Sequence, residues 1–236
     1  DNTDNYAQAY FAYDSKKSGG VTRSHLRFSP NPINSPYLVN LADFVSCSNE
    51  AYVEKYDMLS CLKDGGTFLL NSVHSGEALI HHLPNSFKKA LAQKNAQFYV
   101  IDAVNLAVQI GLGNRTNTIL QSAFFKLNEQ IMPYEQAQDL MKKYAYKSYA
   151  RKGDAIVQLN YKAIEIGAEG LVKVEVDPAW ANLPVEEVVV DADRPDFVKN
   201  IADPVNAIKG YDLPVSAFAD YADGTIPAGT AAYEKR

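Results

Sequence analysis

Two apolar runs in the middle of the chain constrain the fold more than any other feature. Residues 67–71 and 97–102 each carry apolar side chains at consecutive positions. A half-exposed strand would alternate apolar and polar residues, whereas consecutive apolar positions are typical of parallel strands that helices cover on both faces. These two runs therefore predict central strands of a parallel sheet.

Helical spacing of apolar residues predicts the elements that cover this sheet. Asp102 is placed to cap the helix that follows it, and Thr116 or Asn117 to cap the next one. Alternating strands and helices are typical of α/β proteins. Residues 1–169 are therefore predicted to form a three-layer Rossmann-like α/β domain with a mostly parallel sheet. We expect further extended segments at 10–13 and 44–47, and helices over 51–63, 84–94, 103–110, 116–127, 133–149 and 154–169.

Proline changes the character of the chain after Gly170. This last part holds six of the 11 prolines, namely Pro178, Pro184, Pro195, Pro204, Pro214 and Pro227. Proline at this frequency interrupts helices and central strands. Residues 170–236 are therefore predicted to form a proline-rich extended arm or linker, with Trp180 as an apolar anchor.

Charge and cysteine content exclude several classes of protein. The formal net charge is −5, which offers no general attraction for nucleic acid phosphates. No apolar stretch reaches the roughly 18 residues that a membrane-spanning helix needs. Cys47 and Cys61 lack the partner spacing of a zinc or iron–sulfur site, so no bound metal is predicted. Two reduced thiols suit a cytoplasmic protein, and we expect no nucleic acid or membrane partner.

The segment 15–22 combines lysines, glycines and hydroxyl groups directly after a predicted strand. Lys17 supplies an ammonium group and Ser18 a hydroxyl, while Gly19 and Gly20 let backbone N–H groups approach a ligand. These are the parts of a phosphate-binding loop. The spacing matches neither a P-loop nor a dinucleotide-binding fingerprint. A solvated turn is the alternative interpretation.

A second glycine-bearing loop, 111–117, precedes a predicted helix. The positive end of a helix dipole favours anions, and Arg115 can bind a phosphate through two hydrogen bonds. The alternative is a simple helix cap at Asn117. Together the two loops indicate a phosphorylated or adenylated ligand at the carboxyl ends of the strands.

The histidines provide no recognisable catalytic motif. His25, His74, His81 and His82 lie in neither a nucleophile-elbow nor a zinc-protease pattern. Adjacent helix positions point about 100° apart, so His81 and His82 are interpreted as surface residues rather than a ligand pair. No catalytic residue is predicted in this chain.

Beyond these motifs, the chain resembles the pyruvate:ferredoxin (flavodoxin) oxidoreductases. The similarity extends over nearly the whole chain, at 13–22, 24–28, 37–40, 65–72, 101–103, 111–113, 121–127, 213–218, 229–230 and 234–236. Within that family the chain looks like the central, gamma-type domain of the 2-oxoacid:ferredoxin oxidoreductases. The resemblance implies that this domain binds coenzyme A, with Lys17 and Asn117 as contacts. Ser18 and Arg115 are added on physical grounds.

The resemblance also implies what other parts of such an enzyme supply. Thiamine diphosphate, magnesium and 4Fe–4S clusters belong to domains outside this chain, as do the pyruvate-binding residues. Ferredoxin or flavodoxin would accept the electrons, and the whole enzyme would be a homodimer in anaerobic metabolism. The family's upstream glycine-rich loop and downstream cysteine-rich segment are not in this sequence. We therefore expect a fragment that is inactive alone, with residues 170–236 leading toward the ferredoxin-like domain.

Two further interpretations stay open from the sequence. The chain can be a structural module between domains of the same enzyme, with no ligand affinity when isolated. It can also be the same domain from an oxidoreductase of another 2-oxoacid, because substrate choice lies outside this chain.

Overall fold

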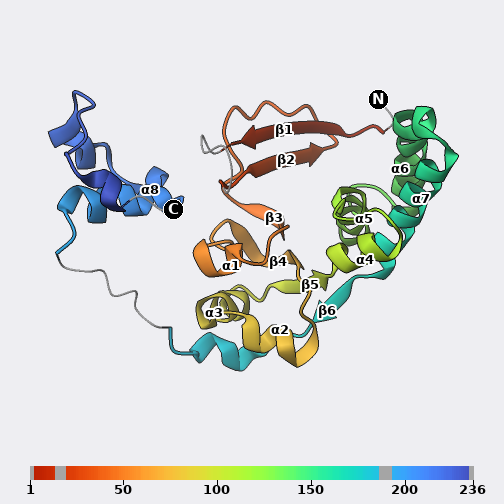
Figure 1. Ribbon diagram of the computed structural model, residues 1–236, viewed down its shortest axis with the longest axis horizontal. Helices are drawn as coiled ribbons and strands as arrows, with labels where there is room; N and C mark the ends of the chain where they lie inside the picture. The colour runs from red at the N-terminus through yellow and green to blue at the C-terminus, as the bar shows by residue number, and fades with distance from the viewer. Residues whose placement is uncertain (1–2, 14–19, 186–192, 234–236) are drawn as a thin grey trace.

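A four-stranded sheet forms the centre of the computed structural model, which describes residues 3–13, 20–185 and 193–233 (Figure 1). The strand order is β3 (Ala42–Cys47), β4 (Leu62–Asn71), β5 (Gln97–Ile101) and β6 (Val172–Val174). β3, β4 and β5 are parallel, and β6 pairs antiparallel with β5. The predicted α/β class with a mostly parallel sheet is confirmed.

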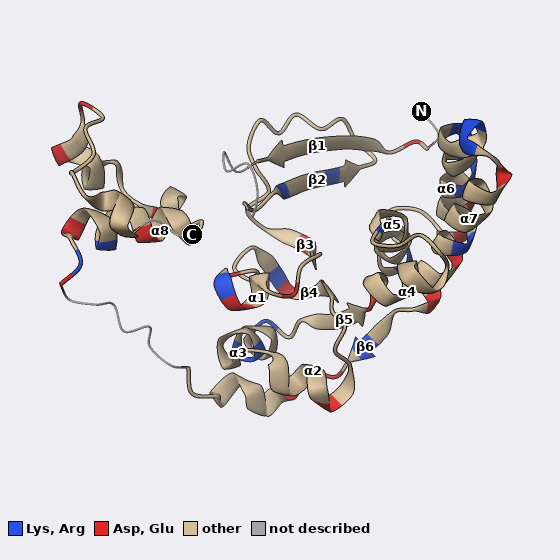
Figure 2. Cartoon of the chain, in the orientation of Figure 1, with Lys and Arg blue, Asp and Glu red and all other residues tan. Residues whose placement is uncertain are grey.

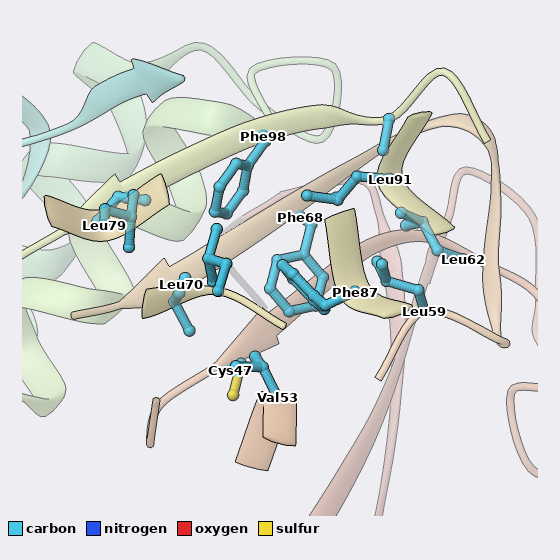
Figure 3. Packing of buried hydrophobic residues seen from close by; sticks show 13 residues of the cluster. Cys47, Val53, Leu59, Leu62, Phe68, Leu70, Leu79, Phe87, Leu91 and Phe98 are labelled. Carbon is cyan, nitrogen blue, oxygen red and sulfur yellow. The ribbon is translucent and has the colours of Figure 1, made fainter. Parts of the chain in front are cut away.

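Both faces of β4 are buried, which explains its run of consecutive apolar residues. Phe68 and Leu70 point into one core, where Phe87 of α3 packs (Figure 3). Leu69, between them in sequence, points into a second core with Ala107 of α4. Side chains alternate across a strand, so consecutive apolar residues supply both cores. Helices on both faces make the arrangement three-layered.

Seven helices lie between β3 and β6 in the described part of the chain, and α6 packs on α5 and α7 rather than on the sheet. Two of the predicted ones, 133–149 and 154–169, agree with the structure almost to the residue, and Asp102 caps α4 by accepting a hydrogen bond from the Asn105 N–H at 3.0 Å. None of the helices in the described residues is both long and apolar enough to cross a membrane. They are α1 (Tyr52–Lys55), α2 (Gly76–His82), α3 (Asn85–Gln93), α4 (Ala103–Gln109), α5 (Asn117–Leu127), α6 (Tyr134–Tyr149) and α7 (Asp154–Glu169).

The helix predicted over 51–63 is wrong beyond its first turn. α1 ends at Lys55, and the Asp57 carboxylate then accepts hydrogen bonds from the N–H groups of Leu59 and Ser60 at 3.2 and 2.9 Å. Such a turn competes with helix formation. Of the apolar residues at helical spacing, Leu59 and Leu62 are buried in the core beyond the end of α1, and β4 already begins at Leu62.

The chain starts with an antiparallel hairpin that forms its own two-stranded sheet, β1 (Tyr6–Ala12) with β2 (Arg23–Ser29). The hairpin contacts α5, because the rings of Phe28 and Phe124 lie 6.0 Å apart. The Asn5 amide also donates to the carbonyl of Ile131 at 2.7 Å.

Past α7 the structure does not show the extended arm. β6 completes the sheet, and a helical turn, η2 (Pro178–Asn182), packs Trp180 against the core, which confirms its predicted apolar role. Residues 193–233 form short helical turns instead of extended chain. They are η3 (Val198–Ala202), α8 (Asp203–Asn206), η4 (Gly210–Asp212), η5 (Val215–Tyr221) and η6 (Thr230–Tyr233).

Contacts among these turns explain why prolines do not leave the segment extended. Arg194 forms two hydrogen bonds with the Asp203 carboxylate, at 2.6 and 2.9 Å, and the rings of Phe197 and Tyr221 pack 4.8 Å apart. Proline is tolerated in the first turn of a helix, where its missing N–H has no partner to lose. Pro178 and Pro204 occupy such positions.

Candidate functional site

A cavity of about 310 Å³ lies where the loop before α5 meets the turn between α6 and α7. Its volume falls at the lower end of the range of small-molecule sites. Every residue of its lining comes from a helix or a loop between helices. The lining is Leu112, Arg115, Asn117, Thr118, Tyr149, Lys152, Ile156 and Asn160.

The first wall is built by the glycine-bearing loop that the sequence singled out. Gly111 and Gly113 have φ values of 85° and 63°, a left-handed conformation that favours glycine. The turn anchors the buried Leu112, whose N–H donates to the Ala107 carbonyl at 2.8 Å. It thereby brings the exposed Arg115 side chain to the start of α5.

The N-terminus of α5 is left without a side-chain cap. Thr116 is the N-cap residue, but its side chain makes no capping hydrogen bond, and Asn117 is the first helical residue. The predicted helix start is confirmed, while the capping hydrogen bond offered as the alternative role is not found. The first-turn N–H groups of a helix have no partner within the helix and favour an anion.

The second wall comes from α7 and the turn before it, which the sequence analysis missed. Lys152 lies over the ring of Tyr149, with its Nζ 5.4 Å from the ring centre. Asn160 is buried, accepts a hydrogen bond from the Thr118 hydroxyl at 3.2 Å and donates to the Ile156 carbonyl at 2.9 Å. An asparagine among the apolar residues of the buried face of α7 was the signal that could have found this wall.

The charged side chains of the cavity lining are all of one sign. Acidic and basic residues are interspersed along α6 and α7 (Figure 2). The cavity lining instead contains two cations, Arg115 and Lys152, and no carboxylate. A guanidinium, an ammonium and an uncapped helix start all favour a bound anion. The cavity is therefore suited to a phosphorylated ligand.

The structure brings together only part of the predicted site. Arg115 and Asn117 share the cavity, whereas Lys17 and Ser18 lie outside the described residues. Gly20 is the first described residue after them, and its carbonyl accepts a hydrogen bond from the Tyr52 hydroxyl of α1 at 3.5 Å. The expected position at the carboxyl ends of the strands is also not met, because α4 separates the second loop from β5.

Neither cysteine is an activated nucleophile. Burial, and to a smaller degree the Glu50 carboxylate, raise the pKa of Cys47 to about 11. Burial also raises the pKa of Cys61. Because the thiolate is the reactive form, both side chains are poorly reactive near neutral pH.

Alkylation of Cys47 is expected to be at least about a hundredfold slower in the folded chain at pH 8 than in urea. A thiol with a pKa two units above an ordinary one contains about a hundredfold less thiolate. The rate in the folded chain should still rise between pH 10 and 11, where an ordinary thiol is almost fully ionised and its rate has levelled off. Mass spectrometry of the Cys47 peptide after timed iodoacetamide treatment measures both rates, and equal rates would contradict the assignment.

Comparison with known proteins places the chain in a family. A family model described as pyruvate ferredoxin/flavodoxin oxidoreductase matches residues 1–170. The chain belongs to this family. A second family model, described as a domain of unknown function, matches residues 184–236.

Curated members of the pyruvate ferredoxin/flavodoxin oxidoreductase family match the entire chain. The pyruvate-flavodoxin oxidoreductase of Klebsiella pneumoniae is 52% identical over 236 residues, and the pyruvate:ferredoxin oxidoreductase of Moorella thermoacetica is 45% identical. In both comparisons the chain spans 20% of the relative's length. The resemblance stated from the sequence is thus confirmed.

A solved structure supports the fold. Pyruvate oxidoreductase subunit PORC from Thermotoga maritima superposes with a TM-score of 0.54 at 19% identity. The match covers 72% of this chain and 83% of that subunit. The match shows that this chain shares the α/β fold of the Thermotoga maritima subunit.

Proposed function

We propose that this chain is the coenzyme A-binding domain of a pyruvate:ferredoxin or pyruvate:flavodoxin oxidoreductase. The longer protein would convert pyruvate, coenzyme A and an oxidised carrier to acetyl-CoA, carbon dioxide and reduced carrier. Family membership and 52% identity to a pyruvate-flavodoxin oxidoreductase support the reaction. The observation that supports the domain's own role is that both charged residues in the lining of the cavity at the start of α5, Arg115 and Lys152, are cationic.

The cavity residues suggest how the nucleotide end of coenzyme A would be held. Arg115 would pair with a phosphate through two parallel hydrogen bonds, and Lys152 would act as a point charge on the opposite wall. Asn117 would donate an amide hydrogen bond beside the first-turn N–H groups of α5. Lys17 and Ser18 remain proposed contacts.

The contribution of this domain would be positioning rather than bond-making, and we propose no catalytic residue within it. Holding the nucleotide end places the thiol near the reacting acyl group, which converts a bimolecular step into an effectively unimolecular one. Thiamine diphosphate, magnesium and 4Fe–4S clusters, bound elsewhere in the longer protein, would supply the decarboxylation and electron transfer. The longer protein would be a cytoplasmic homodimer that passes its electrons to ferredoxin or flavodoxin.

Calorimetric titration of the chain with coenzyme A tests this function. We expect binding that Lys17→Ala, Arg115→Ala and Asn117→Ala each weaken, by about 1 to 3 kcal/mol where a hydrogen bond to a charged group is lost. Arg151→Ala is the matched control, because Arg151 is exposed beside Lys152 but does not line the cavity. An Arg151→Ala loss as large as that of Arg115→Ala would contradict the assigned site.

Added salt should weaken the same binding. Ions screen exposed charge pairs over about 8 Å at physiological ionic strength. The affinity for coenzyme A is therefore expected to fall between low and high salt in the unmodified chain, and to fall less in Arg115→Ala. An affinity that does not change with ionic strength would argue against phosphate pairing.

A structural role between domains is the second candidate, and the hairpin favours it. Phe11, Leu26 and Phe28 lie on one face of the β1–β2 hairpin and are 48%, 46% and 36% exposed. Exposed apolar clusters of this kind often mark interaction surfaces. Absence of any heat at millimolar coenzyme A would support this role over ligand binding.

The choice of 2-oxoacid substrate would be made outside this chain. The cavity is proposed to hold coenzyme A and not the 2-oxoacid. Pyruvate is therefore proposed as the substrate because the relatives are named as pyruvate oxidoreductases. Assaying the longer protein with pyruvate and with 2-oxoglutarate distinguishes this enzyme from one that acts on another 2-oxoacid.

A further inference from the structure

A carboxylate and two imidazoles converge on the side of the sheet near α1 and α2, away from the cavity. The Nδ1 of His74 lies 3.1 Å from the Glu50 carboxylate, and the Nε2 of His82 lies 3.7 Å from the same oxygen. One potential ligand atom from each of the three residues lies within 4.8 Å of the others. The side chains of Glu50, His74 and His82 are 15%, 38% and 42% exposed.

Neighbouring parallel strands explain why these residues meet. Glu50 follows the end of β3, and His74 follows the end of β4. Parallel strands that pair have their carboxyl ends at the same edge of the sheet. The short helix α2 then runs from Gly76 to His82 and returns its last residue to the same place.

Hydrogen bonds hold the two loops in position. The amide of Asn71, at the end of β4, donates to the Ser48 carbonyl at 3.1 Å, and its oxygen accepts from the Ala103 N–H at 3.0 Å. The His74 N–H donates to the buried Ser72 hydroxyl at 2.9 Å. The loop that carries Glu50 is therefore tied to the loop that carries His74.

The ring nitrogens of both histidines lie near the same carboxylate oxygen of Glu50. The imidazoles of His74 and His82 stack with centres 4.4 Å apart and planes inclined by 27°. Glu54 lies at the margin, with its carboxylate 3.9 Å from the Nε2 of His82.

These distances suit a metal ion. Tetrahedral zinc with ligands at about 2.0–2.1 Å holds neighbouring ligand atoms about 3.3 Å apart. The observed 3.1 and 3.7 Å bracket that value. Imidazole nitrogens with a carboxylate select zinc and similar transition metals, whereas Mg²⁺ and Ca²⁺ prefer oxygen ligands.

We propose that Glu50, His74 and His82 form a binding site for a divalent transition-metal ion of the zinc class. This proposal differs from the prediction that the chain binds no metal. That prediction considered the spacing of the cysteines and the adjacent pair His81 and His82, but not the three residues that meet here. Glu54 or a water molecule would occupy the fourth position. The bound ion would cross-link the loops after β3 and β4 with the end of α2.

Titration of the metal-free full chain with Zn²⁺ alone tests the site. We expect one ion per chain, and a loss of affinity of at least about tenfold in His82→Ala, which removes an imidazole ligand, and in Glu50→Gln, which replaces the carboxylate with a neutral amide. His81→Ala is the matched control, since it removes an exposed histidine from the neighbouring helix position outside the cluster. It should bind Zn²⁺ like the unmodified chain.

Thermal unfolding supplies a second readout that does not depend on calorimetry. An ion that binds the folded state raises its Tm. Zn²⁺ should raise the Tm of the unmodified chain and of His81→Ala, but not that of His82→Ala. Equal Zn²⁺ affinity in all variants, or no binding to the unmodified chain, would overturn the proposal and leave the cluster as histidine–carboxylate pairs.

Discussion

Replacing Phe68 with alanine is expected to lower the free energy of unfolding by about 3 to 5 kcal/mol. Phe68 is fully buried between two other rings, with Phe87 5.2 Å away in an edge-to-face contact and Phe98 6.2 Å away (Figure 3). Truncation would leave a cavity on the face of β4 that α3 covers. Urea unfolding followed by circular dichroism measures the change.

Phe11→Ala is the control for this prediction. Phe11 is 48% exposed on the hairpin, so its loss should cost far less than the loss of a core ring. The midpoint for Phe68→Ala should shift to much lower urea while the slope stays near that of the unmodified chain. Similar midpoints for the two variants would show that Phe68 does not anchor the core.

The second large effect is expected for Gly167→Val, at roughly 3 kcal/mol of lost stability. A Cβ atom at Gly167 in α7 would clash with α5. It would lie 2.8 Å from the Cβ of Ser122 and even nearer to the Ile119 carbonyl oxygen. Backbone cannot move aside as a flexible side chain can. The two helices would have to separate, and urea unfolding measures the cost.

Separation of α5 from α7 should also damage the cavity between them. Asn117 stands on α5 and Asn160 on α7, so their distance depends on the close approach at Gly167. Ala155→Val places the same β-branched residue at an exposed position of α7 and should cost well under about 1 kcal/mol. A Gly167→Val variant as stable as Ala155→Val would mean that the helices adjust without strain.

The spacing of apolar residues along the chain predicted the strands and helices in which the buried positions recur regularly. The runs in β4 and β5 are apolar at consecutive positions because both sheet faces are covered, and α6 and α7 have one apolar face each. The helix predicted over 51–63 failed because the same apolar spacing was produced by a turn at Asp57. Spacing alone does not distinguish a buried loop from a helix of the same length.

The candidate sites show the same division. The loop 111–117 could be recognised, because its glycines and Arg115 carry their chemistry within one short segment. Its partner wall at Lys152 and Asn160 could not, and neither could the convergence of Glu50 with His82. No local pattern connects residues that are brought together by strand order and helix packing.

Sequence information was therefore sufficient for the layered α/β architecture and for family membership, since both depend on residues that are close in the chain. The composition of the cavity and of the histidine–carboxylate cluster required the folded arrangement. Both sites consist of side chains from separate elements, and their distances follow from the parallel pairing of β3 with β4 and from the contact of α5 with α7. Those pairings are set by the burial of whole faces, so they become visible only when the elements have packed.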